Sequence, residues 1–205
     1  MSNGELLQSY KQTTAYTLGP ASLLIVLNHF DPTFKLTREN EFRIWHKTVV
    51  LPTRWCSIFA LAKIAHERGI VVNVVVGNPE YKFPGYKFKR FTKEDVEEAT
   101  FSAKILYSDA KKSGVDIEIR NFDLREVKNL LLKNKIVMLR IDTGLMRKQK
   151  HDVSYVLVSG YKNHQYEFYE THEGKKILMK EDELKTYFDS VTEKCKRDSR
   201  MIVFG

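Results

Sequence analysis

A short segment near the N-terminus has the features of a reactive helix start. Gly19-Pro20 predicts that a helix begins here, because proline at the first helical position loses no N–H that the helix needs. Residues 21–27 are apolar on nearly every side, which predicts a central, buried helix. A cysteine at the N-terminus of such a helix would have a lowered pKa and would be a nucleophile. The chain has Leu18 at that position, which can neither ionise nor attack.

With Gln12 included, the segment reads Gln, five residues, then Leu18-Gly19-Pro20-Ala21. It resembles the opening of the C39-like peptidase family of papain-like cysteine peptidases, which has a catalytic cysteine where this chain has Leu18. The resemblance implies that Gln12 occupies the position of the oxyanion donor. Gly-Pro-Ala alone would fit an ordinary buried helix, but further matches downstream favour the family.

The remaining catalytic positions of the family can also be located. The segment from Ser154 to Tyr161 resembles the family's strand of the type His-Trp-Val-Val-Val-Thr-Gly-Tyr, so Ser154 stands where the resemblance implies a catalytic histidine. Ten residues beyond Gly160, the family's aspartate position holds Glu170. The resemblance therefore implies a degenerate member without the catalytic Cys and His, whose vestigial positions are Gln12, Leu18, Ser154 and Glu170.

The order of predicted elements indicates an α+β fold in a single domain, residues 1–205. Apolar spacing, capping residues and β-branched runs predict helices over 21–27, 41–48, 54–68, 92–113, 123–133 and 181–188, and strands over 70–76, 115–119, 136–141, 153–159, 166–169, 175–179 and 201–204. The resemblance implies the papain-like fold, with a helical half at about 1–113 packed on a mostly antiparallel sheet half at about 114–205.

These features give a first functional hypothesis, a catalytically inactive C39-like protein that binds a peptide or a protein tail in a retained papain-like cleft. The expected binding residues are Gln12, Leu18, Gly19, Ser154 and Glu170. A leucine in the floor would make the cleft more apolar than in an active peptidase.

A second hypothesis is a cysteine hydrolase with a relocated nucleophile, Cys56 or Thr17, and His151 as the base. Cys56 lies in a loop that enters a predicted helix, where a thiol pKa can be lowered, although a buried inert thiol fits the same position. His151 precedes Ser154 by three residues, about 10 Å in an extended strand and with its side chain on the opposite face. We therefore expect His151 to be a surface residue unless the strand entry is bulged or looped.

A third hypothesis, an RNA- or ribosome-associated protein, rests on charge. The chain has 34 Lys and Arg against 26 Asp and Glu, a net charge of +8. Five cations lie in or beside one aromatic-rich loop, where they could contact phosphates while the aromatic rings stack on bases. They are Lys82, Lys87, Lys89, Arg90 and Lys93. A solvated basic loop above packed aromatic side chains explains the same residues.

Metals, cofactors and membranes are not expected from the sequence. The two cysteines, Cys56 and Cys195, form no metal-spaced pair, and the six histidines are scattered. No apolar segment precedes Gln12 as a signal peptide would, and the longest apolar run, residues 23–27, is too short to span a membrane. Reduced cysteines and these absences predict a cytoplasmic protein.

Overall fold

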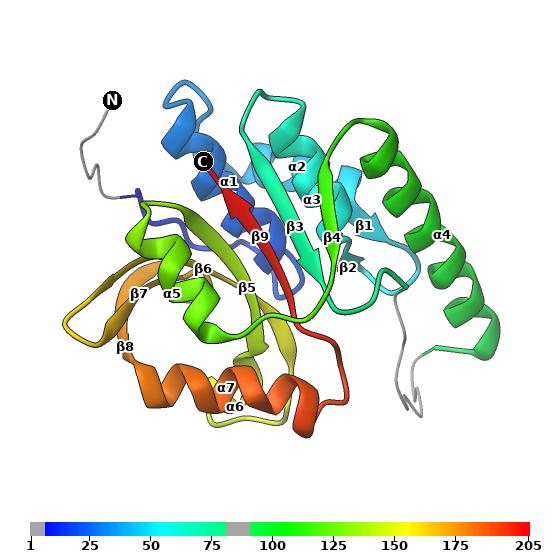
Figure 1. Cartoon of the computed structure of the whole chain (residues 1–205). Coiled ribbons are helices and arrows are strands. Elements are labelled where there is room, and N and C mark those ends of the chain that lie inside the picture. Colours follow the sequence, from blue (N-terminus) through cyan, green and yellow to red (C-terminus); the bar gives the residue numbers. More distant parts are fainter. Residues whose placement is uncertain (1–6, 81–90) are drawn as a thin grey trace.

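A seven-stranded mixed sheet runs through the centre of the computed structural model, which describes residues 7–80 and 91–205 (Figure 1). Its strand order is β4-β3-β9-β5-β6-β7-β8, and every neighbouring pair is antiparallel except β3 and β4. The strands of this sheet are β3 Val72–Val76, β4 Asp116–Ile119, β5 Ile136–Asp142, β6 Val153–Lys162, β7 Gln165–Glu170, β8 Lys175–Lys180 and β9 Arg200–Phe204, and a separate pair is formed by β1 Val49–Val50 and β2 Trp55–Cys56. The helices are α1 Leu18–Phe30, α2 Arg38–Thr48, α3 Ile58–His66, α4 Lys93–Lys112, α5 Leu124–Leu132, α6 Thr143–Met146 and α7 Glu181–Glu193.

Helices cover both faces of this sheet, and the alternation of side chains along each central strand explains why. On β5, Met138 packs in the cluster that contains α1 and α3, whereas Val137 and Leu139 pack in the cluster that contains α5 and α7. On β9, Ile202 belongs to the first cluster and Met201 to the second. Because both faces are covered, the central strands carry runs of consecutive apolar residues, 136–139 on β5 and 201–204 on β9, rather than an apolar residue at every second position.

The predicted α+β class and the mostly antiparallel sheet are confirmed, including the meander of β6, β7 and β8. The sheet is not confined to the second half of the chain, because β3 lies between β4 and β9. The predicted helix over 54–68 begins later than expected. Ser57 accepts the Ala60 N–H and caps α3, while the residues before it form β2.

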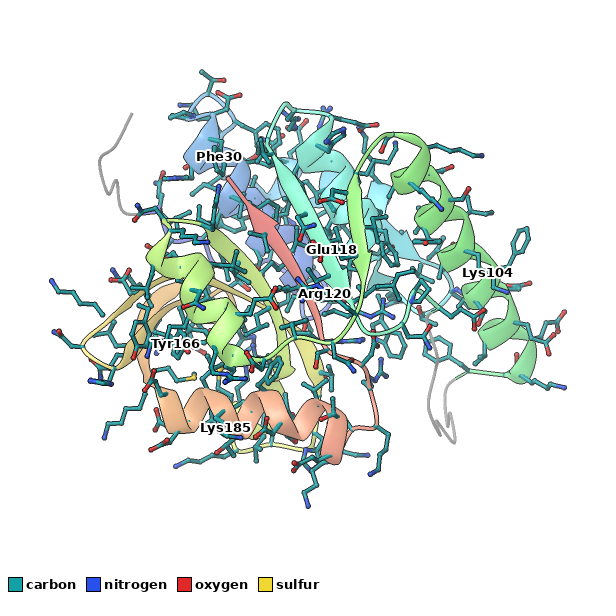
Figure 2. All side chains as sticks on the ribbon, viewed as in Figure 1. Phe30, Lys104, Glu118, Arg120, Tyr166 and Lys185 are labelled. Carbon is teal, nitrogen blue, oxygen red and sulfur yellow. The ribbon has the colours of Figure 1, made fainter. Side chains whose placement is uncertain are left out.

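Charged side chains protect the exposed edge of the sheet at β4. Arg120, just after β4, lies 2.5 Å from Glu118 and 2.7 Å from Glu126 on α5, and Figure 2 shows Glu118 and Arg120 beside each other at this edge. Asn73 on β3 also donates to Glu118 at 2.9 Å. A charged edge of this kind discourages pairing with another chain.

Within residues 7–80 and 91–205, none of the helices combines the length and apolar character needed to cross a membrane.

The N-terminus of α7 is joined to the sheet and to α5 through Glu181. One oxygen of this carboxylate accepts the Lys128 ammonium at 2.8 Å and the Tyr161 hydroxyl at 2.5 Å. The hydrogen bond from Lys128, followed by the one from Tyr161, lowers the pKa of Glu181 from 4.5 to about 2. A carboxyl group with a lowered pKa in the folded state stabilises the fold above its unfolded pKa.

We therefore expect Glu181→Gln to lower the free energy of unfolding above about pH 4.5, with a difference from the wild type that shrinks as the pH falls toward 2. Denaturant unfolding at several pH values measures this difference. The exposed Glu98 on α4 provides the control Glu98→Gln. An equal effect of Glu181→Gln at all pH values would contradict the assigned role of the carboxylate.

Candidate functional site

Helix α1 begins at the wall of a cavity of about 140 Å³. Leu18, its first residue, is 7% exposed, and every residue of the helix from 18 to 27 is buried. The preceding Thr17 accepts the Ala21 N–H through its carbonyl, which closes the first turn. The helix start thus lies inside the protein, and its first two residues, Leu18 and Gly19, line the cavity.

The cavity lies where α1, the short strand β2 and the start of β6 meet. Its lining residues are Ala15, Tyr16, Leu18, Gly19, Trp55, Cys56, Arg140, Asp152, Val153, Ser154, Tyr155 and Arg197. Four of the residues selected from the sequence, Leu18, Gly19, Cys56 and Ser154, are therefore brought together from three distant parts of the chain. Along β6, Tyr155 packs in the core cluster with Leu18, so alternation directs the neighbouring Ser154 toward the other face at the end of the strand.

Gln12 lies beside this region and is held by its own set of hydrogen bonds. Its backbone N–H donates to the Thr171 carbonyl at 2.8 Å, and its side-chain oxygen accepts the Thr171 hydroxyl at 2.8 Å. Its side-chain NH2 donates to the Thr14 carbonyl at 2.9 Å. Gln12 does not line the cavity, and its amide is engaged on both sides by neighbouring protein groups.

A buried carboxylate on α2 fixes the segment that contains Gln12. Glu41 is completely buried and accepts the Thr13 N–H at 3.0 Å, the Thr13 hydroxyl at 2.8 Å and the Tyr10 hydroxyl at 2.8 Å. Burial, and then the hydrogen bond to Glu41, raises the pKa of Tyr10. A buried charge is tolerated only with such donors, so this contact determines the path of residues 10–13 toward α1.

Glu170 ends β7 and has structural partners. Its carboxylate forms an ion pair with Arg147 at 2.6 Å and accepts the Glu173 N–H at 2.6 Å. Glu170 is 7% exposed and is not among the cavity-lining residues. Of the four vestigial positions, the structure brings Leu18 and Ser154 to the cavity and places Gln12 and Glu170 outside its lining.

Of the residues proposed for relocated chemistry, Cys56 lines the cavity and His151 does not. Burial raises the pKa of the Cys56 thiol to about 12, and the opposing hydrogen bond with Thr48 is the smaller effect. Thr17 is fully buried and donates its hydroxyl to the Thr14 carbonyl at 3.1 Å. His151 lies in the loop before β6, outside the cavity lining, with Nδ1 at 2.5 Å from Asp142. Its side chain is 52% exposed, as expected for a surface residue, but its buried partner was not expected.

Eight of the lining residues were not identified from the sequence, and four of these carry charges or a ring N–H: Trp55, Arg140, Asp152 and Arg197. The Arg197 guanidinium lies 5.1 Å from the centre of a Trp55 ring, and Arg140 lies 3.0 Å from Asp198. Desolvation raises the pKa of the Asp152 carboxyl, and Asp142 adds to this against the opposing charge of Arg147. The contacts of Arg197 with Trp55 and of Arg140 with Asp198 join residues far apart in the chain, so no local sequence pattern signals them.

Only one of the five cations that suggested RNA binding, Lys93, lies within the described residues. Lys82, Lys87, Lys89 and Arg90 lie outside the described residues. Lys93 begins α4, where its side chain is 93% exposed and lies 3.8 Å from Glu97. Its position is that of a solvated helix terminus.

One group outside the cavity has the atoms needed to hold a metal ion. Asp142, His151 and Cys195 each offer one ligand atom, and these atoms lie within 4.8 Å of one another. The residues come from the end of β5, the loop before β6 and the turn after α7. They are separated by 9 and 44 positions in the chain, which explains why spacing alone did not indicate a site.

Comparison with known proteins identifies a family. A family model described as the Peptidase_C39 like family matches residues 7–201. The predicted resemblance to C39-like peptidases is confirmed, and the α+β architecture fits the papain-like fold expected for that family. A search of curated proteins gives no match.

The geometry predicts that both native thiols react slowly. With a pKa of about 12, the thiolate fraction of Cys56 at pH 8 is roughly a thousandfold below that of an unperturbed cysteine. Burial, followed by the charge of Asp142, also raises the pKa of Cys195. Alkylation by iodoacetamide at pH 8 should therefore be slow in the native protein and fast in denaturant. Rapid, stoichiometric labelling of native Cys56 would show an activated thiol and would favour relocated chemistry.

Proposed function

The chain belongs to the Peptidase_C39 like family, and we propose that it is a non-catalytic member that binds a peptide or the flexible tail of a protein partner in the cavity beside Leu18. The observation that supports the proposal is that Leu18 and Ser154 both line this cavity. They occupy the positions at which the resemblance implies a nucleophile and a base. Leucine has no group that attacks, and a serine cannot replace imidazole as a base near neutral pH.

The size of the cavity fits one anchoring side chain. Its volume of about 140 Å³ is close to that of engineered apolar cavities, about 150 Å³, that accommodate benzene. Leu18, Val153 and the Cys56 side chain provide apolar surface for such an anchor. A longer ligand would extend beyond this space along the surface of the protein.

The polar residues of the cavity suit the backbone of an extended chain. Arg140 and Arg197 can donate to carbonyl or carboxylate oxygens, and Asp152 can accept from N–H groups. An apolar anchor with a few convergent polar groups is the usual composition of a ligand pocket. A peptide supplies both the side chain and the alternating donors and acceptors that this composition requires.

The proposal that Cys56 acts as a relocated nucleophile receives less support. Its thiol is held protonated by burial, and His151 is engaged with Asp142 rather than lining the same cavity. The alternative role in RNA binding rests on the net charge of +8. Steeply salt-dependent binding, as expected for phosphate contacts, would favour RNA over a peptide.

We expect an unbiased peptide library to yield ligands whose affinity depends on Leu18. The change Leu18→Asp places a charge in the apolar floor, yet an acidic residue at a helix N-terminus is compatible with the helix dipole. Affinity measured by fluorescence anisotropy should fall at least tenfold. Leu178→Asp, at a leucine on β8 that is 58% exposed, is the matched control and should leave affinity unchanged.

Circular dichroism and thermal melting establish that both variants are folded. Equal affinities of wild type and Leu18→Asp would contradict binding in this cavity. The same peptides should not be hydrolysed above background. Turnover that Cys56→Ala abolishes would overturn the non-catalytic assignment and leave the cavity as a binding site.

Replacing the leucine tests whether the helix start retains its electrostatic character. In a background with Cys56→Ser and Cys195→Ser, Leu18→Cys introduces the only thiol of the chain. A thiol at the N-terminus of α1 should have a lowered pKa, so we expect it to alkylate faster than free cysteine at neutral pH. The pH dependence of the alkylation rate gives the pKa directly. An unreactive thiol in a folded variant would show that the helix start is closed to ligands.

A further inference from the structure

A buried carboxylate outside the cavity attracts three side chains to one of its oxygens. Asp142, the last residue of β5, is fully buried. Its Oδ2 lies 2.5 Å from His151 Nδ1, 2.7 Å from the Ser190 hydroxyl and 3.6 Å from the Cys195 sulfur. Two of these three neighbours, His151 and Cys195, are metal ligands when they lose a proton or present a lone pair.

The other oxygen of Asp142 fixes the orientation of the carboxylate. Oδ1 accepts the Leu145 N–H at 3.0 Å and the Asp152 N–H at 3.2 Å. Both hydrogen bonds come from backbone N–H groups, so they hold the carboxylate in one orientation. Asp142 therefore presents its other oxygen in a fixed direction toward His151 and Cys195, as an effective metal ligand does.

The loop that contains His151 is held in place by a close backbone contact. A Cβ at Gly144 would lie 2.0 Å from the Lys150 carbonyl oxygen and 2.5 Å from the Asp152 nitrogen, so only glycine allows this approach. The Gly144 N–H and the Thr143 hydroxyl both donate to the Asp152 carbonyl, at 3.1 and 2.9 Å. The position of His151 relative to Asp142 is thus set before any ligand binds.

Cys195 is also held in place, by a hydrogen bond at the end of α7. Its N–H donates to the Ser190 carbonyl at 2.9 Å, in the turn that ends α7. Ser190 donates its hydroxyl to Asp142 at 2.7 Å, which ties the last turn of α7 to the end of β5. Three separate parts of the chain therefore converge on one point, as in a preorganised site.

We propose that Asp142, His151 and Cys195 form a zinc site in which water is the fourth ligand. Carboxylate oxygen, imidazole nitrogen and thiolate sulfur are all zinc ligands, and a thiolate argues against Mg²⁺ or Ca²⁺. The three ligand atoms lie within 4.8 Å of one another. Bond lengths of about 2.0–2.3 Å in a tetrahedral site require ligand atoms roughly 3.3–3.8 Å apart.

Small movements bring the ligands to these separations. His151 and Asp142 must separate by about an ångström from 2.5 Å to admit an ion with bonds of this length. His151 is 52% exposed, so its ring has room to turn outward. The distance from Cys195 to Asp142, 3.6 Å, already lies in the required range.

The proton balance of zinc binding is simple. The Cys195 thiol loses its proton to solvent, and His151 binds as neutral imidazole through Nδ1 with its proton on Nε2. Without a cation, burial and the Asp142 charge raise the pKa of Cys195. A divalent ion between the two groups reverses that interaction, because it attracts thiolate and carboxylate alike. Ser190 can continue to donate to Asp142 and hold the ligating carboxylate.

Zinc and cobalt titrations of chelator-treated protein test the proposal near neutral pH. Calorimetry should show one equivalent of Zn²⁺ bound by the wild type. Co²⁺ should give the strong visible bands of tetrahedral coordination and a near-ultraviolet thiolate-to-cobalt band. Cys195→Ser should remove the thiolate band, and both Cys195→Ser and His151→Ala should weaken Zn²⁺ binding at least tenfold.

Matched controls use the same residue types elsewhere. Cys56→Ser and His164→Ala, the latter at an 86% exposed histidine, should leave Zn²⁺ affinity and the cobalt spectrum unchanged. Cys195 and His151 are chosen over the fully buried Asp142 because neither is fully buried, and circular dichroism verifies folding. Absence of stoichiometric binding, absence of the thiolate band, or undiminished affinity in either ligand variant would overturn the proposal.

Discussion

The site depends on one constraint, the burial of a helix that is apolar on all sides. Every residue of α1 from 18 to 27 is buried, so the helix must be covered around its whole circumference. The sheet covers one side, and α2 and α3 cover the other (Figure 1). Helix α1 therefore begins inside the protein, where its first residue, Leu18, forms part of the cavity wall. The residue type at position 18 therefore decides what that wall can do.

Two buried carboxylates fix the segments around this helix. Glu41 orders the chain that leads into α1, and Asp142 joins the end of β5 to the loop before β6 and to the end of α7. A buried carboxylate without donors would cost several kcal/mol. Each must therefore collect hydrogen bonds from distant segments, and this requirement positions loops that have little apolar surface of their own.

Local features of the fold were predictable because they depend on neighbouring residues. Thr37 and Asp123 cap α2 and α5 through their side chains, and each cap involves only a residue three positions further along the chain. Gly69 and Gly114 follow α3 and α4 with φ of 78° and 89°, where glycine is favoured. Family resemblance located Leu18 and Ser154, which meet at the cavity.

Contacts between distant residues were not predictable. The periodicity of apolar residues shows which side of a helix or strand is buried, but it does not show which other element covers that side. The insertion of β3 between β4 and β9 depends on the whole sheet. Glu41 lies in a charged segment that reads as exposed, and its burial follows only from the path of Tyr10 and Thr13. The approach of Cys195 to Asp142 likewise requires α7 to lie across the sheet.

The contacts that shape the cavity do not require a nucleophile at position 18, because Leu18 itself packs in the core. Burying a leucine side chain contributes about 1.5–3 kcal/mol, more than the smaller thiol side chain would provide. The core around Leu18 includes Tyr155 and Leu157 of β6, so an apolar side chain at the helix start strengthens the junction between helix and sheet. A leucine at position 18 therefore stabilises the fold more than a cysteine would.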